Sequence, residues 1–174
     1  MIILDFDGTI VPSSKREMIC RHFLKKIGFS RPPRAFLAMG EIFDFFRLLF
    51  SRKTKKGLNN LVEIIQTKKF SIGILTDRSA FSLFLYLKHL GIEKESLVFI
   101  QTRKSLFDFF LFEKGFFVSK ETKPSKMVFE ENLIPFLDSL CLEREKTLIV
   151  DDLLSVREVA KNLGFQTKDP ADLP

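Results

Sequence analysis

Short apolar runs alternate with longer amphipathic segments through most of the chain. The runs have the length and composition of buried strands, whereas the segments between them repeat apolar residues at helical spacing. The predicted strands are the opening run before Asp5 and residues 70–75, 97–100 and 147–150. The predicted helices are residues 58–67, 79–90, 125–139, with Pro135 as a kink or break, and 155–163. This alternation favours a parallel sheet with helices packed on it.

A helical insert interrupts the alternation after the first strand. A helix over residues 13–28, capped by the serines at its start, is followed by two prolines and by a second helix over about residues 35–50. A basic stretch over residues 51–57 ends this insert. We therefore predict a core domain formed by residues 1–12 and 57–174, and a small helical cap formed by residues 13–56.

Two segments are unusually rich in phenylalanine. Between Lys104 and Lys120 the pattern predicts a hairpin that turns at Lys114-Gly115. The second segment, residues 42–50, runs into a cluster of cations. A peripheral membrane anchor is one interpretation of it. We favour the other, in which these phenylalanines pack against the core or against a second copy of the chain in a homo-oligomer.

Composition narrows the classes of function. The 174 residues, 45% of them hydrophobic, suffice for one substantial core. The net charge of +6 favours acidic partners, but the cations are scattered and accompany no nucleic-acid-binding pattern, so no nucleic acid is expected as a partner. No apolar run approaches the roughly 20 residues of a membrane span. Because the two cysteines form no metal or redox motif and the chain opens on a strand, we expect a cytoplasmic protein.

Polar signals fall at the ends of the predicted strands or just beyond them. Asp5 and Asp7 end the first strand, and their spacing places both side chains on one face of an extended chain. The other signals are Thr76, Lys123 and the pair Asp151-Asp152. Because the carboxyl ends of parallel strands meet at one edge of a sheet, we expect these groups to converge on a single crevice.

The residue types in this crevice are complementary. Clustered carboxylates repel one another unless a cation lies among them, and hard oxygen ligands suit Mg²⁺. Asp5, Asp7 and Asp152 can supply such a site. A lysine and a hydroxyl nearby then face an anion held by the metal, which predicts a phosphoryl group.

Each signal also has a structural interpretation. The two first aspartates alone could form a solvated turn, and Thr76 with Asp77 could cap the following helix. Lys126 competes with Lys123, which we prefer because the proline after it stiffens the loop. Arg78 is interpreted as a solvated arginine in the first turn of a helix.

Taken in order, these residues resemble the motifs of the haloacid-dehalogenase-like (HAD) hydrolase superfamily. The four segments that resemble its motifs are Asp5-Phe6-Asp7-Gly8-Thr9, Ile74-Leu75-Thr76-Asp77-Arg78, Lys123-Pro124 and Val150-Asp151-Asp152. The last of them is similar to the phosphoglycolate-phosphatase-like and β-phosphoglucomutase-like subgroup. The resemblance implies an α/β fold in which a Rossmann-like parallel sheet is flanked by helices, with a small helical cap inserted after the first strand.

The resemblance also implies roles for single residues. Asp5 would be the nucleophile that forms an aspartyl-phosphate, and Asp7 would transfer a proton to the leaving oxygen while its backbone carbonyl binds Mg²⁺. Asp152 would bind the metal, with Asp151 beside it directly or through water. The residues expected to bind phosphate are Thr76, Asp77 and Lys123.

The expected function is Mg²⁺-dependent hydrolysis of a phosphate monoester on a small phosphorylated substrate. One alternative is a phosphomutase that uses the same aspartates and returns the phosphoryl group to a sugar. The other is a non-catalytic protein that binds a membrane or a partner and retains the site without turnover.

Overall fold

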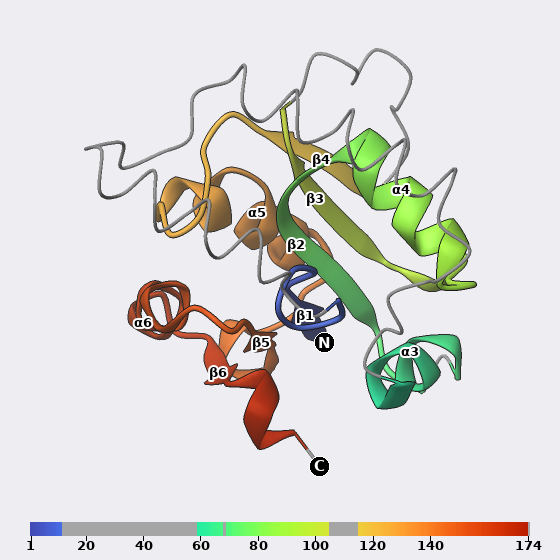
Figure 1. Ribbon diagram of the computed structural model, residues 1–174. Helices are drawn as coiled ribbons and strands as arrows, with labels where there is room; N and C mark the ends of the chain where they lie inside the picture. The colour runs from blue at the N-terminus through green and yellow to red at the C-terminus, as the bar shows by residue number, and fades with distance from the viewer. Residues whose placement is uncertain (12–58, 68, 105–114, 174) are drawn as a thin grey trace, which may run out of the picture.

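In the part of the chain that the structure describes, six parallel strands form a central sheet (Figure 1). The structure is a computed structural model that describes residues 1–11, 59–67, 69–104 and 115–173. The strands are β1 (Ile2–Leu4), β2 (Ile72–Ser79), β3 (Phe99–Arg103), β4 (Phe116–Ser119), β5 (Leu148–Val150) and β6 (Gln166–Lys168). They lie in the order β4-β3-β2-β1-β5-β6, and every neighbouring pair is parallel. The predicted α/β class with a parallel sheet is confirmed.

The first strand occupies the middle of this sheet. Leu4 is in register with Ile74 of β2 on one side and with Val150 of β5 on the other. β2 lies on one side of β1 and β5 on the other, so the strand order changes direction at β1. Open α/β sheets bind ligands at the carboxyl ends of the strands at such a point. Asp5 is the first residue after β1 and lies at this point.

Helices cover both faces of the sheet. On one face lie α3 (Asn59–Gln66) and α4 (Ala80–His89), and on the other lie η3 (Phe129–Leu133), α5 (Ile134–Ser139) and α6 (Leu154–Asn162). The short helices η1 (Lys94–Ser96), η4 (Arg144–Lys146) and η5 (Pro170–Asp172) lie in the connections. Two hydrophobic cores result, one on each side of the strands.

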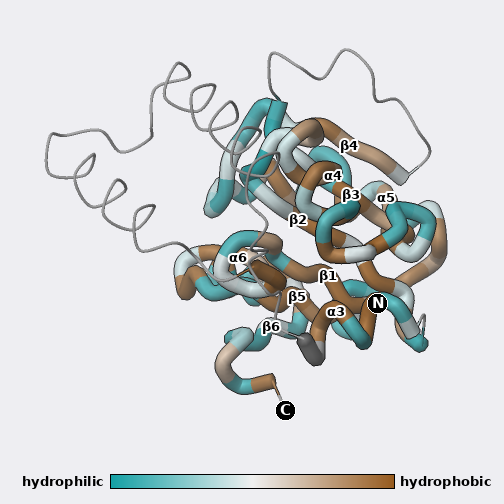
Figure 2. The backbone as a smooth tube through the Cα atoms, turned by 45° about the vertical axis from the view of Figure 1, so that its right-hand side comes forward, coloured by the Kyte–Doolittle hydropathy of each residue, from teal (hydrophilic) through white to brown (hydrophobic). Residues whose placement is uncertain are grey.

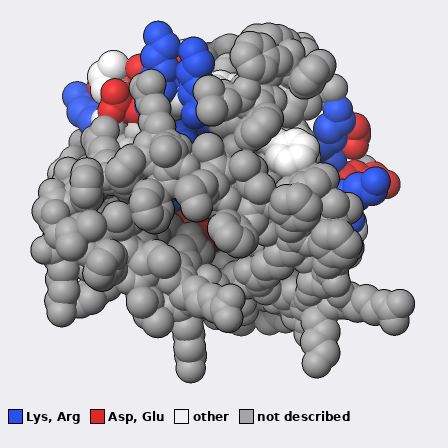
Figure 3. Space-filling model, turned by 45° about the horizontal axis from the view of Figure 1, so that its top comes forward, with Lys and Arg blue, Asp and Glu red and all other residues white. Residues whose placement is uncertain are grey.

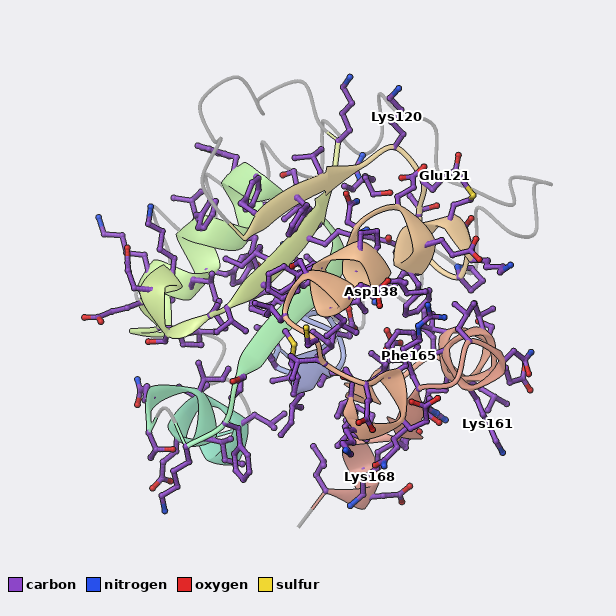
Figure 4. The ribbon with its side chains drawn as sticks, turned by 180° about the vertical axis from the view of Figure 1, so that it is seen from behind. Lys120, Glu121, Asp138, Lys161, Phe165 and Lys168 are labelled. Atoms are coloured by element: carbon purple, nitrogen blue, oxygen red, sulfur yellow. The ribbon has the colours of Figure 1, made fainter. Side chains whose placement is uncertain are left out.

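Successive side chains of a strand point to opposite faces of the sheet, so one strand contributes to both hydrophobic cores. In β1, Ile3 packs with the core under α5 and α6, whereas Leu4 packs with the core under α3 and α4. The central strands are therefore apolar on both faces, and Figure 2 shows β1, β5 and the first half of β2 as hydrophobic segments. After α6 the side chain of Phe165 points inward against Phe129, whereas Lys161 points away from the molecule (Figure 4).

Several element boundaries differ from the prediction. β2 begins at Ile72 and continues through Thr76 to Ser79, so Thr76 and Asp77 belong to the strand. Ser79 then caps α4 by accepting a hydrogen bond from the Ser82 N–H, so the alternative in which Thr76 and Asp77 only cap this helix does not apply. The strand β6 was not predicted, because three residues of mixed polarity give no strand pattern.

The helix around Pro135 also departs from regular geometry. The Ile134 N–H donates to the carbonyl of Phe129, five residues back, so the turns of η3 are wider than those of an α-helix. Since proline has no N–H to donate, the wide turns directly before it keep the helix continuous to Ser139. Instead of the predicted kink or break at Pro135, the helix has wider turns directly before this residue.

Some predictions fall on parts of the chain that the structure does not describe. The cap over residues 13–56 lies outside the described residues, as does the first arm of the predicted hairpin at Lys114-Gly115. The second arm forms β4, which pairs in parallel with β3. Within the described residues, no helix is long and apolar enough to cross a membrane. Lysine and arginine atoms there lie beside aspartate and glutamate atoms on the face that Figure 3 shows, so the described charges on it are mixed in sign.

Candidate active site

A tight turn directly after β1 sets the position of the first two aspartates. The Asp5 N–H still donates to the Val150 carbonyl at 2.8 Å, as in a strand. The carbonyl of Phe6 then accepts hydrogen bonds from the N–H groups of Ile10 and Val11, which folds the chain back on itself. The chain is no longer extended after Leu4, and the carboxylates of Asp5 and Asp7 contact different partners.

The Asp5 carboxylate faces Lys123 and Asp151. The Lys123 ammonium donates to Asp5 Oδ1 at 2.5 Å and to Asp151 Oδ2 at 2.7 Å. All three side chains are at most 5% exposed. Residues from three separate segments thus form one buried ionic group at the carboxyl end of the sheet.

This environment changes the acidity of two of these groups. Burial raises the pKa of the Asp5 carboxyl from 3.8 to about 7; Asp151 and Asp7 add to the rise, whereas the Lys123 ammonium opposes it. Burial alone would lower the pKa of Lys123, but Asp5, Asp151 and Asp77 together hold that pKa above its ordinary value. Lys123 is therefore charged at neutral pH, and the Asp5 carboxyl titrates near neutral pH.

Asp152 completes a cluster that fits a divalent cation. Asp5, Asp151 and Asp152 each present a carboxylate oxygen, and these oxygens all lie within 4.8 Å of one another. Carboxylates this close together repel one another unless a cation lies among them. Hard oxygen donors with one solvent-exposed member are the donor set that Mg²⁺ prefers, since it usually retains water ligands. Mg²⁺ is therefore the cation that suits these residues.

Asp7 is paired with Arg78. Nε of Arg78 donates to Asp7 Oδ2 at 3.1 Å, and Nη2 donates to Oδ1 at 2.5 Å. The guanidinium also donates through Nη1 to Ser82 Oγ at 2.9 Å, and its carbon lies 4.5 Å from the ring centroid of Tyr86 and 5.7 Å from that of Phe6. The prediction of a solvated arginine is wrong: Arg78 lies in β2, and its side chain is only 10% exposed.

The other two residues expected to bind phosphate come from the same strand. Thr76 is buried, and its Oγ1 accepts a hydrogen bond from the Arg78 N–H at 3.1 Å. The Asp77 carboxylate accepts from the Lys123 N–H at 2.9 Å, so this side chain holds the lysine's backbone. A carboxylate in that position is a positioning group for Lys123.

Two further residues position the loop after β5. Arg157 of α6 donates through Nη1 to the main-chain carbonyl of Asp151 at 2.6 Å, and its Nη2 lies 2.8 Å from Asp169 Oδ2. The Asp151 carboxylate also accepts from the Leu153 N–H at 2.9 Å. Sequence reasoning did not find Arg157 or Asp169, because neither belongs to a motif and their contact depends on how α6 and β6 pack.

The structure thus brings the residues singled out from the sequence to one edge of the sheet. Lys123 joins Asp5 and Asp151, whereas Lys126, its competitor, pairs with Glu130 and is 63% exposed. Asp7 lies beside this group, but its carboxylate is bound by Arg78 and is not part of the acidic cluster.

Solved structures align with nearly the whole chain. A HAD family enzyme from Bacteroides thetaiotaomicron, solved as an aspartate-to-alanine mutant with magnesium and inorganic phosphate, aligns over 96% of this chain and 91% of its own with a TM-score of 0.51 and 14% identity. A HAD-superfamily hydrolase from Ehrlichia chaffeensis aligns over 95% and 84% with a TM-score of 0.52 and 12% identity. The fold is that of the HAD-like hydrolases. A candidate phosphoglycolate phosphatase from Lactobacillus plantarum aligns over 98% and 85% with a TM-score of 0.56 and 11% identity.

Sequence comparison alone does not detect the similarity to these HAD-like proteins. No protein-family model and no curated protein matches the chain. At 11–14% identity the structural likeness establishes the fold, and the chemistry has to be argued from the site itself.

Proposed function

We propose that the protein hydrolyses phosphate monoesters in a Mg²⁺-dependent reaction that passes through an aspartyl-phosphate on Asp5. The observation that carries the proposal is the buried group formed by Asp5, Lys123 and Asp151 beside the exposed Asp152. A carboxylate nucleophile, a fixed cation and a set of metal ligands at the carboxyl end of a parallel sheet are the parts that phosphoryl transfer needs.

The metal would be held by Asp5, Asp151 and Asp152, with the Asp7 backbone carbonyl as a further ligand. When bound, Mg²⁺ would neutralise negative charge on the phosphoryl oxygens and favour the ionised form of Asp5. The cluster supports this assignment because its three carboxylate oxygens lie within 4.8 Å of one another, an arrangement that a bound cation stabilises.

The side chains of this site divide the reaction between them. In the first step an Asp5 oxygen bonds to phosphorus as the bond to the leaving oxygen breaks, and Asp7 gives that oxygen a proton. In the second step Asp7 takes a proton from water, the water oxygen bonds to phosphorus, and the bond to Asp5 breaks to release phosphate. Lys123 stabilises the charge on Asp5, and the Thr76 hydroxyl, which accepts from a backbone N–H, is able to donate its own proton to a phosphoryl oxygen.

The proposed substrates are small phosphorylated molecules. No nucleic-acid partner is proposed, because the cations of the sequence are scattered and accompany no nucleic-acid-binding pattern. A phosphomutase would use the same residues, and the described residues contain no feature that favours it.

The test is phosphate release from an aryl phosphate and from a panel of phosphorylated metabolites, with Mg²⁺ or with EDTA. We expect release by the wild type that depends on Mg²⁺ and is lost in Asp5→Asn. Asp138→Asn, at an exposed position on α5, is the matched control and should retain activity. Full activity of Asp5→Asn would contradict the mechanism, and product isomers without released phosphate would favour a mutase.

A further inference from the structure

Arg78 holds Asp7 by both oxygens of its carboxylate. The two hydrogen bonds come from Nε and Nη2, the edge of the guanidinium that matches a carboxylate in bidentate geometry. The Arg78 side chain is 10% exposed and that of Asp7 15% exposed. Such a pair fixes the plane of the carboxylate as well as its position, which a single point charge would not do.

The guanidinium is itself held on its other sides. Its Nη1 donates to Ser82 Oγ, and Ser82 is buried at the start of α4. The rings of Tyr86 and Phe6 lie within cation–π distance of the guanidinium carbon and contact each other edge to face. Arg78 is therefore a fixed support, and its orientation is determined by α4 and by the residue between the two aspartates.

The main chain of Arg78 reaches a second member of the site. Its N–H donates to Oγ1 of Thr76 at 3.1 Å. One residue thus contacts both Thr76 of β2 and Asp7 of the turn after β1, which have different roles in the proposed reaction. An arginine that only anchored α4 would need neither contact.

We infer that Arg78 is a positioning residue that holds the Asp7 carboxylate in the orientation required for proton transfer with the leaving oxygen. The inference rests on the proposed function. A direct contact with the substrate is the competing role for an arginine at this position. It is disfavoured because three donors of the guanidinium already point at Asp7 and Ser82.

Leaving-group dependence separates these roles. An alkyl phosphate needs a proton on its leaving oxygen, whereas an aryl phosphate with an acidic phenol needs little help. We expect Arg78→Lys, which keeps the charge but not the bidentate geometry, to lower kcat for an alkyl phosphate on the order of 100-fold, with little change in KM. For p-nitrophenyl phosphate the same variant should lose less than about tenfold.

A double variant and a matched control complete the experiment. Arg78→Lys combined with Asp7→Asn should show no further loss beyond Asp7→Asn alone, because both changes remove the same proton transfer. Lys88→Ala, which removes an exposed cation from α4, should leave kcat and KM unchanged for both substrates. Thermal unfolding of each variant verifies that it folds, and Arg78→Ala should show the same substrate dependence as Arg78→Lys.

Each other outcome identifies which claim has failed. If the wild type released no phosphate, the proposed function would be overturned and this inference with it. If the wild type were active but Arg78→Lys raised KM at constant kcat, Arg78 would be a substrate contact. Equal losses for alkyl and aryl phosphates, or additive losses in the double variant, would also overturn the inference and leave the proposed function standing.

Discussion

Gly8 and Asp152 approach each other so closely that a β-carbon at position 8 would overlap the Asp152 carboxylate. Gly8 follows Asp7 in the turn after β1, and Asp152 follows β5. The φ angle of Gly8 is +95°, in the left-handed region that side chains disfavour. The close approach therefore brings the loop after β1 and the loop after β5, with the carboxylates they carry, close together.

Gly8→Ala should disrupt the metal site and lower stability. The left-handed backbone alone costs about 1–2 kcal/mol for a residue with a β-carbon, and the overlap with Asp152 adds to that cost. We expect a lower melting temperature and weaker Mg²⁺ binding, measured by thermal unfolding and by calorimetric titration.

Gly164→Ala is the matched control. Gly164 has φ +91°, but a β-carbon there would lie 3.6 Å from its nearest neighbour, Oε1 of Glu145, at an ordinary contact distance. This variant should show the backbone cost without loss of Mg²⁺ affinity. Equal Mg²⁺ affinities in the two alanine variants would show that the contact between Gly8 and Asp152 does not shape the site.

The sequence predicted which residues of the candidate site lie at or near the ends of strands. Asp5, Thr76 and Asp151 follow or end apolar runs, and the parallel sheet brings such positions together whatever the details of packing. The residues that support them were harder to find. Arg78 reaches Asp7 across 71 positions, and this contact depends on β2 continuing to Ser79, which a hydrophobic pattern ending at Leu75 does not indicate.

The spacing argument for the first two aspartates shows the same limit. An i, i+2 pair shares a face only while the chain stays extended, and here the strand stops at Leu4. The turn that follows is stabilised by main-chain hydrogen bonds to Phe6, which no side-chain pattern indicates. Proximity of Asp5 and Asp7 was predicted, whereas their separate partners required the structure.

Lys123→Met should destabilise the metal-free protein strongly. Removing the ammonium leaves Asp5 and Asp151 buried against each other without a cation, a change that typically costs about 3–5 kcal/mol. We expect a large loss of stability in EDTA, a partial recovery with Mg²⁺, and no phosphate release. Chemical denaturation with and without the metal measures the first two effects.

Lys126→Met provides the comparison for this prediction. Lys126 pairs with Glu130 at the surface, where an ion pair contributes at most about 1 kcal/mol. Its removal should leave stability, metal response and phosphate release close to the wild-type values. A similar loss in both variants would mean that Lys123 has no special role in balancing the buried carboxylates.

The raised pKa of Asp5 predicts a pH dependence of stability. Because the pKa of this carboxyl is about 7 in the folded protein and 3.8 ordinarily, the folded state binds more protons than the unfolded state between these values. The metal-free protein should therefore lose stability as pH rises from about 4 to about 7, and Asp5→Asn should flatten this interval. Denaturation curves in EDTA across this range, with Asp138→Asn as the exposed control, measure the difference; parallel profiles of wild type and Asp5→Asn would contradict the raised pKa.

Metal binding should follow the opposite course over the same interval. A cation binds the ionised carboxylate, so Mg²⁺ affinity should rise as pH increases toward about 7 and then level off. Calorimetric titrations at several pH values test this, with proton release expected at the lower ones. Binding that is independent of pH would mean that Asp5 is not a ligand.

Arg157 and Asp169 should contribute to metal affinity although neither is a ligand. Arg157 bridges the main-chain carbonyl of Asp151 and the carboxylate of Asp169, and therefore fixes the loop that carries Asp151 and Asp152. Removal of groups that orient metal ligands commonly costs 10-fold to 100-fold in affinity, so Arg157→Ala should weaken Mg²⁺ binding by about tenfold. Lys161→Ala, which removes a cation that points away from α6 (Figure 4), should leave the affinity unchanged.

A double-variant cycle separates loop positioning from a general effect of charge. Asp169→Asn removes the partner that fixes the guanidinium of Arg157, so it should weaken Mg²⁺ binding in the same direction as Arg157→Ala but less strongly. If Asp169 acts only through Arg157, the double variant should bind Mg²⁺ no more weakly than Arg157→Ala alone. Tighter binding in Arg157→Ala would instead indicate that the positive charge repels the metal, because loss of a cation near the site would then outweigh loss of its hydrogen bond to Asp151.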